Sequence, residues 1–201
     1  MIEAKVGARL GEFQLRAEIK GDGTTCLAGK NGAGKTTLMR AIAGFLSVDE
    51  GYVRVGGTDV TNQPVEKRGV VLVTPSTYIP HLGVDSHIVW GARIRRVKPP
   101  GGYVSKVKSD LGIDYAGTVG NLSRGMRQRV ALATALISSP KAILVDEAFL
   151  GLNDRESFIS TYRTLTKGVG IDLVFSSQDE EDGNLADNLF VMNDGVATPK
   201  R

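Results

Sequence analysis

The sequence has little cysteine, no long apolar stretch and no strong charge of either sign. Its single cysteine, Cys26, excludes an internal disulfide, and its apolar, β-branched surroundings predict a core position in a reducing compartment. No run of 18 apolar residues occurs, and the first residues lack the apolar region of a signal peptide. We therefore expect neither export nor a membrane-spanning segment.

Acidic and basic residues nearly balance, with 25 Lys and Arg against 22 Asp and Glu, for a formal net charge of +3. This weak excess and the absence of long coiled-coil heptads argue against a nucleic-acid partner. Part of the excess lies between Arg93 and Lys98 and at Lys106 and Lys108. Such a cluster could meet acidic lipid headgroups or a partner protein, but a solvated helix face explains it more simply.

A glycine-rich stretch, residues 29–37, fits the phosphate-loop pattern G-x-x-x-x-G-K-[ST] at every fixed position. A short apolar stretch precedes it and predicts a buried strand over residues 24–28. The pattern after it predicts a helix with Leu38, Ala41, Ile42 and Phe45 on one face. A glycine-rich turn that matches by chance is the alternative, and the strand before and helix after argue against it.

The residue types in this stretch suit the binding of nucleotide phosphates. Glycine permits backbone angles that let amide groups approach phosphate oxygens, and the helix that follows directs its positive end at the same place. Lys35 is expected to reach the β- and γ-phosphates, and the Thr36 hydroxyl to ligate Mg²⁺. The predicted nucleotide-binding residues are Asn31, Gly32, Ala33, Gly34, Lys35, Thr36 and Thr37.

An acidic pair, Asp146 and Glu147, follows the apolar stretch 142–145. A strand buried on both faces delivers its last residues to the edge where α/β sheets bind ligands. Asp146 is expected to hold Mg²⁺, directly or through water, and Glu147 to polarise the attacking water as a general base. Alone, the pair could be a chance acidic turn; its occurrence with a phosphate loop favours the nucleotide site.

Alternating strand and helix patterns predict an α/β fold with a mostly parallel central sheet and an N-terminal antiparallel β-subdomain. The 201 residues are expected to form a single domain with three subdomains. These are a β-rich part with the phosphate loop (1–73), a helical insertion (75–120), and a third part (121–201) with a helix capped by Ser123. In that third part, residues 189–192 are predicted to form the last strand, turned by residues 193–195.

The stretch 122–129 supplies a third motif and a family resemblance. It reads L-S-R-G-M-R-Q-R, against the signature L-S-G-G-Q-x-Q-R of ATP-binding cassette proteins. With the phosphate loop and the acidic strand in matching order, the chain resembles the nucleotide-binding domain of that family over nearly its whole length. The resemblance implies an ATPase of the P-loop NTPase fold that uses ATP and Mg²⁺.

The resemblance also implies partners. It implies a head-to-tail homodimer that sandwiches ATP between one phosphate loop and Ser123, Arg124 and Gly125 of the other chain. Residues 64–69 and 80–93 resemble those of importer subunits, especially for molybdate, tungstate and other oxyanions. In such subunits the helical insertion docks on an integral membrane permease, which implies a cytoplasmic location, peripheral on the inner face of the membrane.

Several positions depart from the family pattern. Thr74 stands where the family has a glutamine that touches Mg²⁺ and water, and Ser177 where it has a histidine that contacts the γ-phosphate. Arg124 and Met126 replace signature residues, Ala148 a proline and Asn153 an aspartate. The family's adenine-stacking aromatic falls near Leu10, with Phe13 the nearest ring. With Lys35, Thr36, Asp146 and Glu147 intact, we expect tight nucleotide binding with slow hydrolysis.

Three functions therefore compete. The leading one is the ATP-hydrolysing subunit of a transporter, in which Thr74 and Ser177 join Glu147 as catalytic residues. The others are a regulatory nucleotide-binding module with little or no catalysis and a soluble cassette protein outside transport. The mild charge and the importer-like insertion argue against the last.

Overall fold

The computed structural model describes residues 1–200, so Arg201, the end of the predicted third subdomain, lies outside the described part. The strands are β1 (Ile2–Leu10), β2 (Phe13–Gly21), β3 (Thr24–Ala28), β4 (Glu50–Val55), β5 (Thr58–Asp59), β6 (Val70–Val73), β7 (Ala142–Val145), β8 (Asp172–Ser177), β9 (Asn188–Asn193) and β10 (Val196–Lys200). The helices are α1 (Lys35–Ala43), α2 (Val84–Ile94), α3 (Tyr103–Asp110), α4 (Arg124–Ile137) and α5 (Arg155–Gly168). Short 3-10 turns are η1 (Val65–Lys67), η2 (Val119–Asn121) and η3 (Glu180–Leu185).

The strands form one sheet in the order β5-β4-β1-β2-β10-β9-β3-β8-β7-β6. Strands β9, β3, β8, β7 and β6 pair in parallel, whereas β1, β2, β4 and β5 pair antiparallel. The predicted fold class, a mostly parallel central sheet beside an N-terminal antiparallel part, is confirmed.

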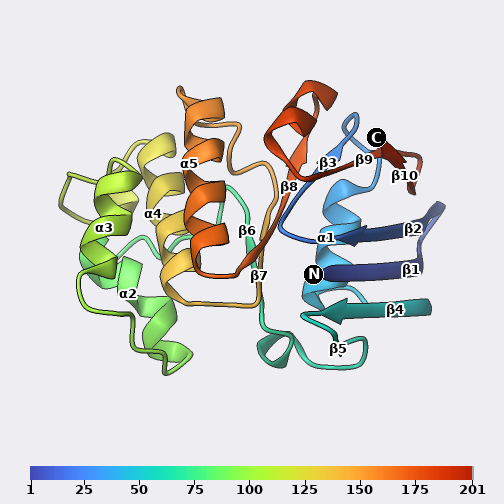
Figure 1. Ribbon diagram of the computed structural model, residues 1–201, viewed down its shortest axis with the longest axis horizontal. Helices are drawn as coiled ribbons and strands as arrows, with labels where there is room; N and C mark the ends of the chain where they lie inside the picture. The colour runs from blue at the N-terminus through green and yellow to red at the C-terminus, as the bar shows by residue number, and fades with distance from the viewer. Residues whose placement is uncertain (201) are drawn as a thin grey trace.

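Helices cover the parallel strands on both faces (Figure 1). On one face α1 packs between these strands and the antiparallel strands, and its Leu38 and Ile42 share a core with Leu144 and Val174. On the other face α4 and α5 pack on Phe175 and its neighbours. Each buried strand thus contributes side chains to both cores, because successive side chains point to opposite faces of the sheet.

Two local predictions are wrong. Helix α1 ends at Ala43 because Gly44 takes a left-handed conformation (φ 90°), so Phe45 leaves the helical face and is 55% exposed. Residues 189–192 do not form the last strand, because β10 follows the turn and pairs antiparallel with β9. It also meets β2 through the pair Val196 and Arg16, which joins the antiparallel and parallel parts of the sheet.

Other local predictions are confirmed. Cys26 lies in β3 with no exposed surface, and burial raises the pKa of its thiol to about 12. The Ser123 hydroxyl caps α4 by accepting a hydrogen bond from the amide of Met126 at 3.3 Å. Among residues 1–200, no helix has the length and apolar character needed to cross a membrane.

Candidate functional site

The phosphate loop connects the end of β3 to the first turn of α1. The Gly29 amide donates to the Ser177 carbonyl at 3.1 Å, which ties the loop to β8. Gly29 has φ 150°, and a Cβ there would lie 2.4 Å from the Met192 carbonyl oxygen. Gly34 has φ 104°, and a Cβ there would lie 2.9 Å from the Phe13 ring. Both positions require glycine because the backbone angle and the space exclude a side chain.

A cavity of about 220 Å³ lies over this loop and brings distant segments together. Its walls come from the loop, from the first turn of α1, from the start of β2 and from the residue after Asp146. The lining residues are Phe13, Asn31, Gly32, Gly34, Lys35, Thr36, Thr37 and Glu147. Seven of these eight residues are predicted site residues; Phe13, the eighth, is the aromatic ring that lies at the loop.

Two residues that the sequence suggested for nucleotide contact, Ala33 and Leu10, do not line the cavity. Ala33 is 5% exposed and does not line the cavity; its carbonyl accepts a hydrogen bond from the Gly195 amide at 3.0 Å. Leu10 is 40% exposed and is also absent from the lining. Of the two residues considered for contact with an adenine ring, only Phe13 is therefore at the cavity.

Lys35 is buried and folds back over the loop. Its Nζ donates to the carbonyls of Gly29 at 2.5 Å and Lys30 at 2.9 Å. Burial lowers the pKa of Lys35, while the nearby carboxylates of Asp146 and Glu147 act in the opposite direction. The ammonium group is thus held at the loop with two acidic residues close enough to affect its ionisation.

The chain fits a bound Mg²⁺-nucleotide at this place. The amide groups of Gly32, Gly34, Lys35 and Thr36 have no hydrogen-bond acceptor among residues 1–200, and they lie at the start of α1. Free amides at a helix N-terminus bind phosphate oxygens. Within that range no three His, Cys, Asp or Glu side chains form a metal cage. Mg²⁺ needs none here, since it commonly takes one or two protein oxygens and completes its shell with phosphates and water.

Asp146 and Glu147 follow β7, as predicted, and a third residue holds them. The Asp146 amide donates to the Val73 carbonyl at 2.8 Å, and its side chain is 6% exposed. The Ser176 hydroxyl donates to Asp146 Oδ1 at 2.9 Å and accepts from the Glu147 amide at 2.9 Å. Glu147 has φ 57°, a left-handed conformation that costs a non-glycine residue about 1–3 kcal/mol.

The hydroxyl of Ser177 lies on the other face of the sheet. Val174 packs in the core around α1 and Phe175 in the core around α5, so alternation places Ser176 on the α1 face and Ser177 opposite. The Ser177 hydroxyl donates to the buried carboxylate of Asp182, which also pairs with Arg155 of α5. The structure therefore does not bring the Ser177 hydroxyl to the phosphate loop, and its contact with a γ-phosphate stays a prediction.

Thr74 directly follows β6, and its side chain closes a local turn. Its amide donates to the Thr77 hydroxyl at 2.9 Å, and the two hydroxyl oxygens lie 3.0 Å apart. Thr74 is not among the residues that line the loop cavity. Its predicted contact with Mg²⁺ and water is therefore untested by this arrangement.

The signature residues Ser123, Arg124 and Gly125 form the start of α4, outside the cavity over the phosphate loop. Ser123 and Arg124 are exposed. A Cβ on Gly125 would lie 3.2 Å from the Gly151 carbonyl, so this helix start packs on the segment that follows Glu147. In this structure the start of α4 thus contributes no lining residue to the cavity over the chain's own phosphate loop.

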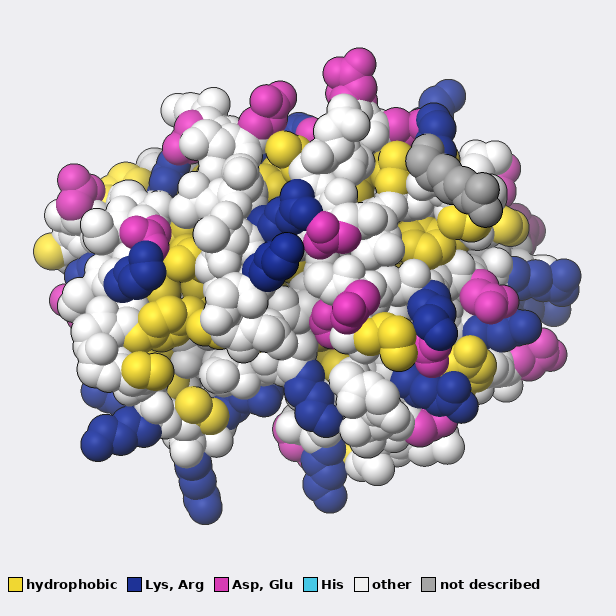
Figure 2. Space-filling view, in the orientation of Figure 1, with side chains coloured by type: hydrophobic (Ala, Val, Ile, Leu, Met, Phe, Trp, Pro, Cys, Tyr) yellow, Lys and Arg dark blue, Asp and Glu magenta, His cyan; other side chains and the backbone are white. Residues whose placement is uncertain are grey.

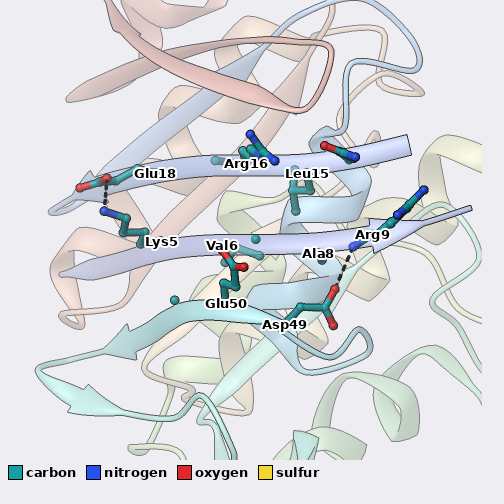
Figure 3. A pocket seen from close by; sticks show the side chains of 13 residues that line it. Lys5, Val6, Ala8, Arg9, Leu15, Arg16, Glu18, Asp49 and Glu50 are labelled. Atoms are coloured by element: carbon teal, nitrogen blue, oxygen red, sulfur yellow. Dashed lines mark hydrogen bonds and ion pairs between the residues drawn. The ribbon is translucent and has the colours of Figure 1, made fainter. Parts of the chain in front are cut away.

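Further hollows lie away from the phosphate loop, one of them beside α3 and α5. A second, of about 370 Å³, lies over β1, β2 and the start of β4 (Figure 3). There the Lys5 ammonium pairs with the Glu18 carboxylate at 3.5 Å, and the Arg9 amide donates to the Asp49 carboxylate. A third, of about 450 Å³, is a mainly apolar groove between α2, α4 and the segment after β6. Trp90 and Ile94 line this groove and are 42% and 60% exposed.

Basic and acidic side chains intermingle on the molecular face shown in Figure 2. This agrees with the net charge of +3. Surface charge thus marks no single extended patch on that face.

Sequence reasoning missed Ser176, Asp182 and Arg155. A polar residue at the end of a buried strand was a signal for Ser176, because alternation from Val174 places it on the face that carries α1. Asp182 and Arg155 carried no such signal. They meet only because η3 folds back on α5.

Comparisons with known proteins agree with this geometry. A family model described as ABC transporter matches residues 13–150. The chain is 37% identical over 193 residues to the spermidine/putrescine import ATP-binding protein PotA of Bacteroides thetaiotaomicron, covering 90% of this chain and 41% of that protein. It is 35% identical over 188 residues to the sulfate/thiosulfate import ATP-binding protein CysA 2 of Agrobacterium fabrum, covering 87% of this chain and 55% of that protein.

A solved ATP-binding cassette of an ABC transporter in its ADP conformation superposes with a TM-score of 0.77 at 25% identity. The match covers 98% of this chain and 89% of that one. The chain spans about half the length of the curated relatives named above.

Proposed function

Since the chain belongs to the ABC transporter family, we propose that it binds and hydrolyses ATP for a membrane transporter of importer type. The single observation that carries this proposal is the cavity over the phosphate loop, which Lys35, Thr36 and Glu147 line together. The relatives named as import ATP-binding proteins support the direction of transport. The transported solute is proposed to be small, such as an oxyanion, and to be selected by the permease and its binding protein.

Each residue has a proposed role. The free amides of Gly32, Gly34, Lys35 and Thr36 and the Lys35 ammonium bind the phosphates. Phe13 packs against the base. Thr36 and Asp146 hold Mg²⁺, which neutralises phosphate charge when bound. Glu147 accepts a proton from the attacking water. Residues 1–201 act as one ATP-binding domain with the three subdomains defined above.

We propose that two chains assemble head to tail around ATP. Ser123, Arg124 and Gly125 would contact the nucleotide on the partner's phosphate loop. The capped start of α4 is suited to anions, and the Arg124 side chain adds a charge-assisted contact with phosphate. In the free chain a cation at this helix start is unfavourable, which is consistent with a role in binding rather than in stability.

The groove lined by Trp90 and Ile94 is proposed to receive a permease segment on the cytoplasmic face of the membrane. The Nε atom of Arg95 lies buried in this region with no hydrogen-bond partner among residues 1–200. An apolar helix with an acidic residue would complement both features. Ile94→Asp should abolish copurification with the permease and leave ATP binding by the isolated chain unchanged; retained copurification would exclude this groove.

The test of the enzymatic role is steady-state phosphate release with Mg·ATP by wild type, Lys35→Ala and Glu147→Gln. Release by wild type that disappears in both variants supports the assignment of Lys35 and Glu147. Glu147→Gln should then accumulate as an ATP-bound dimer in size-exclusion chromatography with light scattering. A variant that remains monomeric with ATP would exclude the sandwich.

A regulatory nucleotide-binding module is a second candidate function. The observation that favours it is the Ser177 hydroxyl, which is bonded to Asp182 instead of facing the loop. Slow hydrolysis is proposed for the same reason. ATP binding without phosphate release, alone and with permease present, would support the regulatory module over the ATPase.

A further inference from the structure

One hydroxyl, that of Ser176, joins the two acidic residues of the site. We propose that Ser176 is a positioning residue, which aims Glu147 at the cavity and fixes Asp146 beside it. This inference rests on the proposed function, in which Glu147 is the general base and Asp146 a magnesium ligand. It adds a residue from β8, a strand that contributes no side chain to the cavity lining.

The contacts use the hydroxyl in both directions. The Ser176 Oγ–H donates to Asp146 Oδ1 at 2.9 Å, and the oxygen accepts from the Glu147 amide at 2.9 Å. A hydroxyl has one donor, so the bond to Asp146 occupies it and the Glu147 amide uses a lone pair. Ser176 is 4% exposed, so bulk water does not reach it to take over these bonds.

The backbone around Glu147 explains why this anchor matters. Glu147 adopts φ 57°, which a non-glycine residue keeps only when surrounding contacts determine it. On one side its amide is held by Ser176; on the other its carbonyl accepts from the Leu150 amide at 3.1 Å. Without the bond to Ser176, the peptide group between Asp146 and Glu147 can rotate. The orientation of that peptide sets the direction of the Glu147 side chain.

The same hydroxyl orients Asp146. The Asp146 amide donates to the Val73 carbonyl at 2.8 Å, and Asp146 Oδ1 accepts from the Ser176 hydroxyl. The second carboxylate oxygen of Asp146, Oδ2, therefore remains for a metal. Ser177 cannot replace Ser176, because its hydroxyl is on the opposite face with Asp182. The two neighbouring serines of β8 thus make hydrogen bonds on opposite faces of the sheet, Ser176 with the acidic pair and Ser177 with Asp182.

The first measurement needs no nucleotide. Amide hydrogen exchange followed by NMR should show the Glu147 amide exchanging at least tenfold faster in Ser176→Ala than in wild type, because its acceptor is gone. Ser176→Thr, which keeps a hydroxyl, should retain protection. Thr166→Val is a matched control that removes another buried hydroxyl, whose one partner among residues 1–200 is the Arg163 carbonyl. Equal protection in wild type and Ser176→Ala would overturn the inference.

The second measurement concerns the reaction. Ser176→Ala should lower kcat for phosphate release by about 10- to 100-fold, since small misplacements of a catalytic group cost this much, and should change KM by less than about threefold. Its affinity for a fluorescent ATP analogue should equal the wild-type value without Mg²⁺ and stay within about threefold of it with Mg²⁺. An unchanged kcat in an active wild-type background overturns the inference. If wild type releases no phosphate, alone and with permease present, but the exchange result holds, the proposed function fails and the anchoring contact stands.

Discussion

Arg68 is expected to be among the most important single side chains for stability. It is 5% exposed and lies just before β6, where its guanidinium faces the C-terminal end of α1. Nη1 donates to the carbonyls of Ala41 at 2.9 Å and Ile42 at 3.1 Å. Its other nitrogens donate to the carbonyls of Gln63 and Thr61. We predict that Arg68→Met destabilises the fold by about 3 kcal/mol, from two lost buried bonds to a charged donor at about 1.5 kcal/mol each.

Opposing effects bound this figure. The bonds to Gln63 and Thr61 are only partly buried, so water replaces them in the variant and they are left out of the sum. Arg68 is 5% exposed, and burial lowers its pKa because the charged form loses solvation; the variant recovers that cost. Against this, the positive charge at the end of α1 is favourable, and the methionine leaves carbonyls without donors.

Urea denaturation followed by circular dichroism would measure the loss. For a chain of this length about 3 kcal/mol corresponds to a fall in Tm of about 6–12 °C. Arg93→Met is the matched control, because it removes the same charge from an exposed position on α2 and should change stability by less than about 0.5 kcal/mol. A loss below about 1 kcal/mol in Arg68→Met would refute the argument that these carbonyls depend on the guanidinium.

Three further predictions follow from buried polar groups. His87 is buried, its Nε2 accepts from the Ile79 amide at 3.0 Å, and burial lowers its pKa below 6.5. The unfolded chain therefore binds a proton first as the pH falls, so the stability due to neutral His87 is complete above about pH 6.5 and is lost between there and the lower folded pKa. Denaturation midpoints from pH 7.5 to 5 should show this slope, and His87→Asn should flatten it; a slope unchanged by the substitution would exclude His87 as its source. Tyr162→Phe removes the bond from a fully buried hydroxyl to the Leu132 carbonyl at 2.9 Å and should cost about 1–2 kcal/mol in urea denaturation. Asp182→Ala leaves Arg155 and Ser177 without their shared partner and should cost about 2 kcal/mol, whereas an equal Tm for the variant and wild type would show that this cluster contributes nothing.

The local patterns of the sequence were sufficient to predict the phosphate loop, the acidic pair after β7 and the Ser123 cap. Each depends on residues that are neighbours along the chain: glycines where backbone angles require them, apolar residues ending in carboxylates, and a hydroxyl before a helix. The parallel sheet also followed from the alternation of strand and helix patterns. These features depend on backbone angles, capping hydrogen bonds and hydrophobic patterns among residues close in the chain, so residue spacing alone predicts them.

Other features were decided only when distant segments came together. The sequence could align Ser177 with a family position, but it could not show that the Ser177 hydroxyl faces Asp182 while the neighbouring Ser176 faces the acidic pair. Strand β10 was missed because its pairing with β9 and β2, and not its own composition, stabilises it. The sequence did not distinguish Arg68 from the other basic residues; its burial and its bonds to four carbonyls are properties of the folded structure. Hydrogen bonds between groups far apart in the chain depend on which face each side chain takes, and only the packed tertiary structure determines that.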